Sequence, residues 1–434
     1  MSATLTFVAA APTRTYAEGE DPFLFRRART WWLLLALFLM AQGNGLFTRQ
    51  DSTYWGMKTV QQELESSSFF LLLTVMLWVI CAGLMFARIG PTVRIALKQK
   101  AVLAFAVLAF LSALWSQDPL LTLRKATLMF ISFAFAWFFA TYYSPADQMR
   151  LLLGAGVVAA LASIAMVLLL PEYGIATGGE WKGVFGHKNH LGLGIFFLFS
   201  ALPFCRVPNG RRLLTLALQA ILPIGLILLS QSRTALIMTA VLIAVRILGP
   251  YIASRSRDQL PFVLYTAIFG TVVAVLATTL GREIILPMLG RETTLSGRTE
   301  HWAVLAPFAF RHLWLGYGYN AFWTGAGDSL RVMNLIGGGM KGSDSGYVDT
   351  MLQFGLVGMG MLLVLLVVCV QDFARLFRKD SVPLVACWYA GLILATFVGS
   401  VTEGLFLAPT GVTTFIFVVA CAGLRSLSLE SASL

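Results

Sequence analysis

Residues 126–143 read ATLMFISFAFAWFFATYY, an apolar stretch that contains no charged side chain. Runs of this kind recur along the chain, and most are long enough to cross a hydrocarbon core of about 30 Å. No water reaches that depth to bond with the backbone, so each run is predicted to be a helix. The pattern therefore predicts an all-α polytopic membrane protein.

On both sides of this stretch the apolar runs recur, and together they predict about twelve transmembrane helices. Their boundaries lie near residues 31–48, 67–87, 101–115, 126–143, 151–170, 190–205, 213–230, 234–250, 260–281, 347–370, 382–400 and 406–424. The predicted domains are a cytoplasmic tail at 1–30, helices one to nine within 31–281, an outer loop at 282–346, helices ten to twelve within 347–424 and a cytoplasmic tail at 425–434. The last two helices are also compatible with one re-entrant hairpin.

Composition excludes an ordinary soluble protein. Of the 434 residues, 58% are hydrophobic and 12% are charged, whereas soluble domains carry about 45–50% apolar and about 25% charged residues. The five cysteines lie in or at the edge of apolar runs without CxxC spacing. They are therefore interpreted as small hydrophobic residues, not as disulfides or metal ligands.

The distribution of charge predicts the orientation. With a cytoplasmic N-terminus, the inner segments hold 19 of the 32 Lys and Arg residues and 8 of the 21 Asp and Glu residues. The outer segments then hold 13 basic and 13 acidic residues, so the whole net charge of +11 lies inside, as the positive-inside rule requires. The positive charge is thus a topology signal and does not indicate a nucleic-acid partner.

One outer segment, residues 281–346, is far longer than the other connections, and a connection beyond about 15 residues is usually functional or structured. It contains Trp302, Trp314 and Trp323, which is too aromatic a composition for disorder. The segment is predicted to form amphipathic helices on the membrane surface, with residues 295–312 as the best candidate.

A first group of polar residues precedes the sixth predicted helix. Lys182, His187, Lys188, Asn189 and His190 place amines, imidazoles and an amide at a helix N-terminus, where free N–H groups and the helix dipole favour phosphate. The histidine pair also suits a metal ion, but metal sites need three or four ligands and no third is near. An interfacial loop that caps the helix is the competing interpretation.

A second group is the turn at residues 230–234, which reads SQSRT. The turn between the two flanking helices is so short that Arg233 must sit at or just below the membrane surface. A snorkelling arginine is the simple interpretation. The flanking hydroxyl and amide residues argue instead for a fixed polar pocket.

The long outer loop supplies a third group. Its candidate substrate-binding or catalytic residues are Arg291, Arg298, His301, Tyr319 and Tyr347. Arginine presents a planar fork that matches phosphate oxygens, so converging arginines would hold a pyrophosphate. A loop whose balanced charges only solvate the outer face is the competing interpretation.

Two carboxylates, Asp344 and Asp349, stand where the tenth predicted helix begins. One of them is expected to face the positive end of that helix, and the other is a candidate catalytic base. Signatures of soluble enzymes such as GxGxxG, GxSxG and HExxH are missing from the sequence. The sequence also lacks a pair of Gly/Pro-broken helices in matching halves, which argues against a transporter repeat.

These segments together resemble the O-antigen ligase/polymerase superfamily, which includes Wzy-type and ExoQ-like polysaccharide polymerases and WaaL-type O-antigen ligases. The matching stretches occur in the family's order within residues 100–360. They read WSQDP at 115–119, TLRK at 122–125, GVFGHKNHLG at 183–192, SQSRTA at 230–235, SGRTEHW at 296–302, GYG at 316–318, SDSGY at 343–347 and GLVG at 355–358.

The resemblance implies a GT-C-like glycosyltransferase of the bacterial inner membrane, with its active site facing the periplasm. The implied donor is a glycan on undecaprenyl pyrophosphate, and the family's two essential arginines correspond to Arg233 and Arg298. In the ligases a histidine stands near the start of the helix after the long loop, whereas this chain has Asp344 between two serines. That departure favours a polymerase.

A mechanism consistent with the resemblance needs neither a metal nor another cofactor. Arg233 and Arg298, assisted by Lys188 or Arg124, would neutralise the charge that develops on the leaving pyrophosphate. Asp344, or alternatively His301, would take the proton of the attacking acceptor hydroxyl.

Polymerisation of lipid-linked repeats into exopolysaccharide or O-antigen is the leading prediction. The alternatives are a ligase that transfers glycan to lipid A-core and a flippase or exporter of lipid-linked glycan. A flippase would place basic residues along a central cavity, whereas the cations here cluster at one face. Membrane lipids and polysaccharide chain-length and export proteins are the other expected partners.

Overall fold

The computed structural model describes residues 36–37, 83, 89–205, 212–253, 298–324, 327–336, 342–376, 383–409 and 411–433. The described residues form helices and no strand, and one isolated bridge joins Ile175 to Trp181. The predicted span at 260–281 and the candidate residue Arg291 lie outside the described residues. The predicted spans at 31–48 and 67–87 are described only at Ala36, Leu37 and Gly83.

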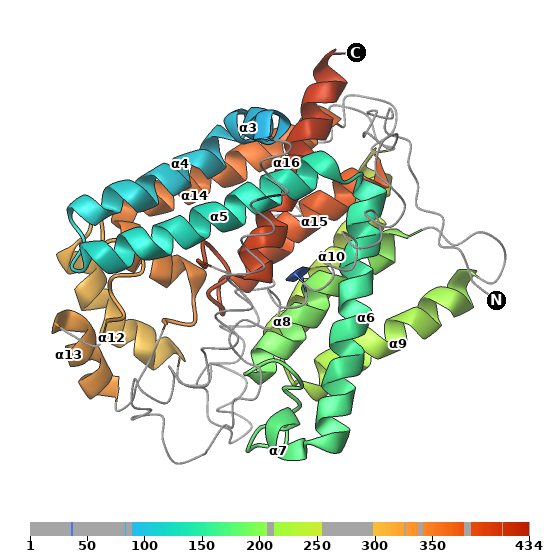
Figure 1. The fold of residues 1–434 in the computed structure, drawn as a ribbon, viewed down its shortest axis with the longest axis horizontal. Coiled ribbons are helices and arrows are strands. Elements are labelled where there is room, and N and C mark those ends of the chain that lie inside the picture. Colours follow the sequence, from blue (N-terminus) through green and yellow to red (C-terminus); the bar gives the residue numbers. More distant parts are fainter. Residues whose placement is uncertain are drawn as a thin grey trace.

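The described helices follow one another along the chain with short connections (Figure 1). They are α3 (Ile89–Lys98), α4 (Lys100–Leu111), α5 (Pro119–Tyr142), α6 (Pro145–Leu169), α7 (Pro171–Gly174), α8 (Lys188–Phe199), α9 (Arg212–Leu229), α10 (Arg233–Ala253), α12 (Arg298–Arg311), α13 (Gly327–Ile336), α14 (Gly346–Leu376), α15 (Leu384–Gly399) and α16 (Val412–Ser433), with 3₁₀ turns η1 (Ser112–Leu114) and η2 (Leu202–Phe204).

Within the described ranges, four helices are long and apolar enough to cross a membrane: α5, α6, α14 and α16. The bent pair formed by α3 and by α4 with η1 makes a fifth span if it is counted as one. The segment Gln219–Leu229 of α9 and the whole of α15 are shorter apolar helices. The chain is therefore a multi-pass helical membrane protein, and the total of about twelve spans stays a prediction.

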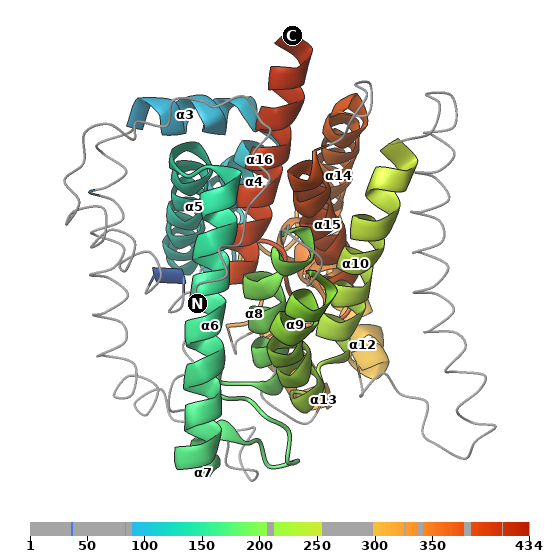
Figure 2. The same cartoon turned by 90° about the vertical axis from the view of Figure 1, so that its right-hand side faces the viewer.

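Several helix boundaries differ from the sequence prediction. Helices α5 and α6 begin at Pro119 and Pro145, whereas the spans were expected from residues 126 and 151. The interval between predicted spans 67–87 and 101–115 contains α3, which turns by 95° into α4 at Gln99 and lies across the end of the bundle in Figure 2. The last span was predicted from residue 406, but α16 begins at Val412. Pro409 and Gly411 lie in this interval, and both residue types disfavour a helix interior.

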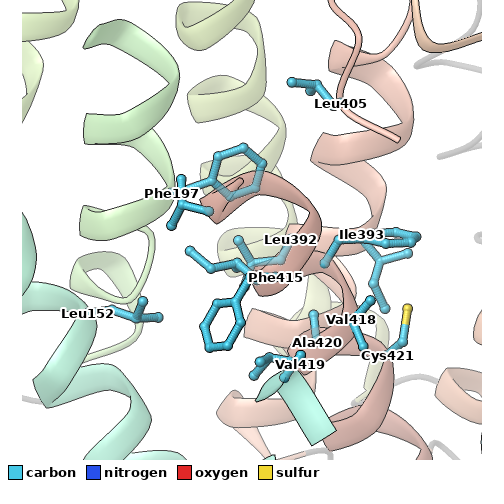
Figure 3. Packing of buried hydrophobic residues seen from close by; sticks show 14 of the residues in the cluster. Leu152, Phe197, Leu392, Ile393, Leu405, Phe415, Val418, Val419, Ala420 and Cys421 are labelled. Atoms are coloured by element: carbon cyan, nitrogen blue, oxygen red, sulfur yellow. The ribbon is translucent and has the colours of Figure 1, made fainter. Parts of the chain in front are cut away.

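The core lies where α6, α8, α15 and α16 pack together. Figure 3 shows Leu152, Phe197, Leu392 and Phe415 from these helices turned towards one another, and each is buried. Phe415 also stacks on Phe135 of α5 with ring centroids 5.1 Å apart. The burial of such large apolar side chains fixes the relative positions of the helices that carry the polar residues described below.

Helix α14 is broken at Gly355, which has φ +59° and ψ −151°. The backbone groups freed by the break are bonded to an outer segment that precedes the helix. Leu356 and Val357 donate to the carbonyls of Leu313 and Trp314, and Tyr317 donates to the carbonyl of Leu352. A Cβ on Gly355 would lie 2.5 Å from the carbonyl oxygen of Leu313, so the close approach of the two backbones requires glycine there.

The described parts of the predicted outer and inner segments include helices that lie at opposite ends of the bundle. In Figures 1 and 2, α7, α12 and α13 lie towards one end, and α3 and the C-terminus lie towards the other. A helix, α12, is observed within the expected range 295–312; its amphipathic character and its position on the membrane surface stay predictions. Which end faces the periplasm stays a prediction.

Candidate active site

The centre of the candidate site is Arg298, the first residue of α12. Its side chain is only 16% exposed, and two carboxylates share one edge of the guanidinium. Nη2 lies 2.9 Å from Oε1 of Glu403, and Nε lies 3.4 Å from Oδ2 of Asp344. Arg298 belongs to the long outer loop predicted from the sequence, and the fold brings it together with the segments of Asp344 and Glu403.

Glu403 is a functional candidate that the sequence analysis missed. It lies in the connection between α15 and α16, and its side chain is 10% exposed. Its Oε1 also accepts a hydrogen bond of 2.7 Å from Nδ2 of Asn189. Burial raises the pKa of Glu403 to about 7; the positive charge of Arg298 opposes that rise, and the negative charge of Asp344 adds to it.

One sequence signal was available for Glu403. It is a charged residue in a short gap between two strongly apolar runs. Charged groups placed near membrane depth are functional candidates by default. No motif surrounds Glu403, so from the sequence it counts only as one of the outer acidic residues.

The start of α8 forms one wall of the site. His187 caps the helix, and its Nδ1 accepts a hydrogen bond of 3.3 Å from the backbone N–H of Asn189. The rings of His187 and His190 are 5.7 Å apart. Burial, followed by the charges of His190 and Lys188, lowers the pKa of His187 to about 4, so this ring is neutral at pH 7.

Lys188 is paired with a carboxylate other than Glu403 and Asp344. Its Nζ forms an ion pair of 2.7 Å with Oε1 of Glu180. The predicted phosphate-binding role of Lys188 thus competes with an ion pair inside the protein. Lys182, the other lysine of this segment, is buried with 1% of its surface exposed.

The turn that carries Asp344 is held by Asp349. Oδ1 of Asp349 accepts hydrogen bonds from the backbone N–H of Ser343 at 3.1 Å and from Nε1 of Trp323 at 3.3 Å. Trp302 of α12 donates to the carbonyl of Ser343 at 2.8 Å. Asp344 itself has a φ of +53° and a side chain that is 54% exposed.

The first turn of α14 docks on the connection that carries Glu403. The backbone N–H of Gly346 donates to the carbonyls of Ser400 at 2.8 Å and Glu403 at 3.0 Å. A Cβ on Gly346 would lie 2.9 Å from the ring of Phe406, so this contact leaves little room for another residue. The docking explains why Asp344 and Glu403 reach the same guanidinium.

Arg233, the first residue of α10, is exposed. No ion pair joins it to any residue in the described part of the chain. Its neighbour Thr234 shares a hydrogen bond of 2.9 Å with Thr402. Thr402 directly precedes Glu403, which is the ion-pair partner of Arg298. The turn that carries Arg233 and the ion pair of Arg298 therefore belong to one polar region.

The remaining candidates lie at different places. His301 is half-buried and follows Arg298 by three residues on α12, so both side chains share a face of that helix. Arg124 is exposed on α5, and Tyr347 donates a hydrogen bond of 2.8 Å to the carbonyl of Phe397. The side chain of Tyr319 is fully buried and donates to the carbonyl of Leu407, so it has no surface for a substrate in this structure.

Within the ranges that the structure describes, no group of three or more His, Cys, Asp or Glu side chains has the arrangement of a metal site. The two histidines at 187 and 190 remain a pair. The polar cluster instead joins an arginine, two carboxylates and an amide from four separate segments of the chain. The arginine of such a cluster is able to bind an anion in exchange for a carboxylate, and the carboxylates are able to hold or release a proton.

Comparison with known proteins gives two findings. Residues 218–364 match the family described as O-Antigen ligase. The chain is also similar to the exopolysaccharide production protein ExoQ of Rhizobium meliloti (strain 1021), with 27% identity over 335 residues, which cover 73% of this chain and 74% of that protein. The family match includes Arg233, Arg298 and Asp344, and it ends before Glu403.

Proposed function

Because the chain belongs to the O-antigen ligase/polymerase superfamily, we propose that it is a GT-C-like glycosyltransferase that polymerises oligosaccharide repeats carried on undecaprenyl pyrophosphate. The reaction takes place at the periplasmic face of the bacterial inner membrane and produces exopolysaccharide or O-antigen. The observation that carries the proposal is the largely buried Arg298, held at the start of α12 beside Glu403, Asn189 and the turn of Arg233.

In the proposed reaction, the bond between the anomeric carbon and the pyrophosphate oxygen breaks, and its electron pair stays on the pyrophosphate. Arg298 and Arg233 stabilise that charge electrostatically, because preorganised donors act strongly where water is excluded. Arg298 stands at the N-terminus of α12, where the helix dipole adds to the effect. The arrangement assigns no step to a metal ion.

The acceptor hydroxyl attacks the anomeric carbon from the side opposite the pyrophosphate and loses its proton to a base. Asp344 suits this role because it is half-exposed and is held to Arg298 by a single contact of 3.4 Å. His301, one turn further along α12, is the alternative base. Glu403 suits it less, since its Oε1 is fixed by both Arg298 and Asn189.

Two observations favour polymerisation over ligation. The similarity to ExoQ covers most of both chains, and the turn before α14 carries Asp344 where the ligases have a histidine. The family description, O-Antigen ligase, favours the second candidate function, which is transfer of finished glycan to lipid A-core. Chain-length and export proteins are the proposed partners of the polymerase.

The test uses purified full-length protein and a lipid-linked oligosaccharide donor, with and without lipid A-core acceptor, in the presence of EDTA. A ladder of longer lipid-linked products from the donor alone supports the polymerase. Transfer only when lipid A-core is present identifies a ligase, and the lack of any new glycosidic bond in both assays contradicts the proposed function. Activity that is lost in EDTA and restored by Mg²⁺ contradicts the metal-independent mechanism.

A further inference from the structure

Glu403 occupies an unusual position for a carboxylate that takes no proton in the proposed reaction. Its single oxygen Oε1 binds both Nη2 of Arg298 and Nδ2 of Asn189, two partners that lie 105 and 214 residues away in the sequence. Three separate elements therefore meet at one oxygen atom. A bond network of this kind fixes the guanidinium of Arg298 in one orientation.

The edge of Arg298 that Glu403 and Asp344 share is formed by Nε and Nη2. This edge forms two parallel hydrogen bonds when arginine binds a carboxylate or a phosphate. A pyrophosphate that takes the same edge must compete with both carboxylates. Asp344 is half-exposed and can turn away, whereas Glu403 is enclosed and is retained by Asn189.

We infer that Glu403 is a positioning residue that competes with the donor's pyrophosphate for Arg298, so that donor binding requires the negative charge of Glu403 to be neutralised by a proton. This inference deepens the proposed function and rests on it. Asn189 keeps the side chain beside Arg298 when the pyrophosphate arrives. The pyrophosphate then shares the guanidinium with a neutral carboxyl group instead of a second anion.

The charges around Glu403 support this coupling. The groups that face it are Arg298 from α12, Asp344 from the turn before α14 and Asn189 from α8, with Thr402 linking its segment to α10. His187 is neutral at pH 7 because burial lowers its pKa to about 4, so it supplies no compensating charge. The pKa of Glu403 is already about 7, and an added pyrophosphate would raise it further by repulsion.

The sign of the pH dependence follows. A ligand that raises the pKa of a group binds most tightly when that group is protonated. Donor affinity should therefore be highest below about pH 7 and should fall by up to about tenfold per pH unit above it. Replacing Glu403 with glutamine keeps a side-chain oxygen for Arg298 and Asn189 but removes the charge, so it should remove the pH dependence.

The experiment measures the dissociation constant of a short-chain polyprenyl pyrophosphoryl sugar on purified full-length protein from about pH 6 to about pH 9. The pyrophosphate of this probe is a diester whose charge is constant over that range. The variants are Glu403→Gln, Glu403→Asp, which retains the charge, and Glu172→Gln, an exposed control on α7. We expect Glu403→Gln to bind the probe about tenfold more tightly than wild type at about pH 8, with a flat profile.

Glu403→Asp and Glu172→Gln should keep the slope of the wild type. A Glu403→Gln protein that keeps the wild-type slope would overturn the inference. The inference would also be overturned if Glu403→Gln bound the probe with wild-type affinity but lost turnover at saturating donor, because Glu403 would then act in the chemical step. Wild-type protein that fails to bind the probe at any pH would contradict the proposed function itself, a result distinct from either of these.

Discussion

Each end of the helix bundle holds a buried carboxylate in a cluster with arginine, but the ratio of carboxylates to arginines is reversed between the two ends. At the end near the C-terminus, Oδ1 of Asp372 accepts hydrogen bonds from Arg375 at 2.9 Å, Arg425 at 2.6 Å and Ser428 at 3.2 Å. At the other end, one arginine, Arg298, is shared by two carboxylates. The first cluster has a surplus of positive charge, and the second has a surplus of negative charge.

The two clusters also differ in how the chain assembles them. Asp372 and its partners lie on α14 and α16, two packed helices, and Arg375 follows Asp372 by only three residues. The cluster around Arg298 takes residues from α8, α12, the turn before α14 and the α15–α16 connection. The first arrangement is typical of ion pairs that hold two packed helices together. The second resembles catalytic sites, which tend to combine loop residues held by a rigid scaffold.

The largest effect should come from the two arginines of the proposed active site. Arg298→Lys and Arg233→Lys keep the charge but lose the planar fork, and removing one preorganised donor typically costs on the order of 10²–10³ in rate. We expect losses of this size in polymer formed per folded molecule, measured on the lipid-linked donor at equal membrane levels.

The matched control is Arg331→Lys, an arginine of α13 with a side chain that is 69% exposed. It should retain near-normal activity. Equal damage in all three variants would show that the outer region had misfolded, and near-normal activity of the first two would contradict the assignment of the arginines to the pyrophosphate.

Asp372→Asn should have the opposite phenotype. It leaves two arginines with a neutral acceptor, and an inadequately satisfied buried group costs about 1–3 kcal/mol. We expect a lower melting temperature of the detergent-solubilised protein and normal turnover per folded molecule. A loss of turnover without a loss of stability would remove the distinction between the two clusters.

The smallest effect should come from Asp349, which supports the active site without contacting Arg298. Asp349→Ala removes the acceptor of the Ser343 N–H and the Trp323 indole N–H. Two hydrogen bonds worth together roughly 1.5 kcal/mol are lost, which corresponds to about tenfold in rate if the turn of Asp344 is misplaced. Asp349→Asn keeps the oxygen and should be milder. Steady-state turnover of the two variants compares them directly, and equal losses would favour a chemical role for the charge.

Long apolar helices were the part of the fold that the sequence predicted best. The predicted span 213–230 corresponds to Arg212–Leu229, and 234–250 corresponds to Arg233–Ala253. Apolar runs report helices because a backbone in hydrocarbon must bond within its own segment. The pattern did not predict α3, because its mixture of apolar and basic residues resembles a positively charged inner connection.

The candidate site could be predicted only in part. Arg298, Asp344 and Asn189 carry recognisable motifs, and the fold places all three in one cluster. Glu403 has no motif, and its role depends on contacts with residues more than 100 positions away. Tyr319 shows the reverse case, since an aromatic residue in a glycine-rich outer loop suggests substrate binding, whereas the structure buries it against the protein.

The break in α14 bears on how the chain is assembled during synthesis. The ribosome delivers residues 313–318 before Gly355, yet the backbone groups at the break find their partners only in that earlier segment. In lipid, each unbonded backbone group costs several kcal/mol. The second half of α14 therefore cannot settle at its final depth until the outer segment has docked. We therefore expect the final insertion of α14 and the docking of residues 313–318 to depend on each other.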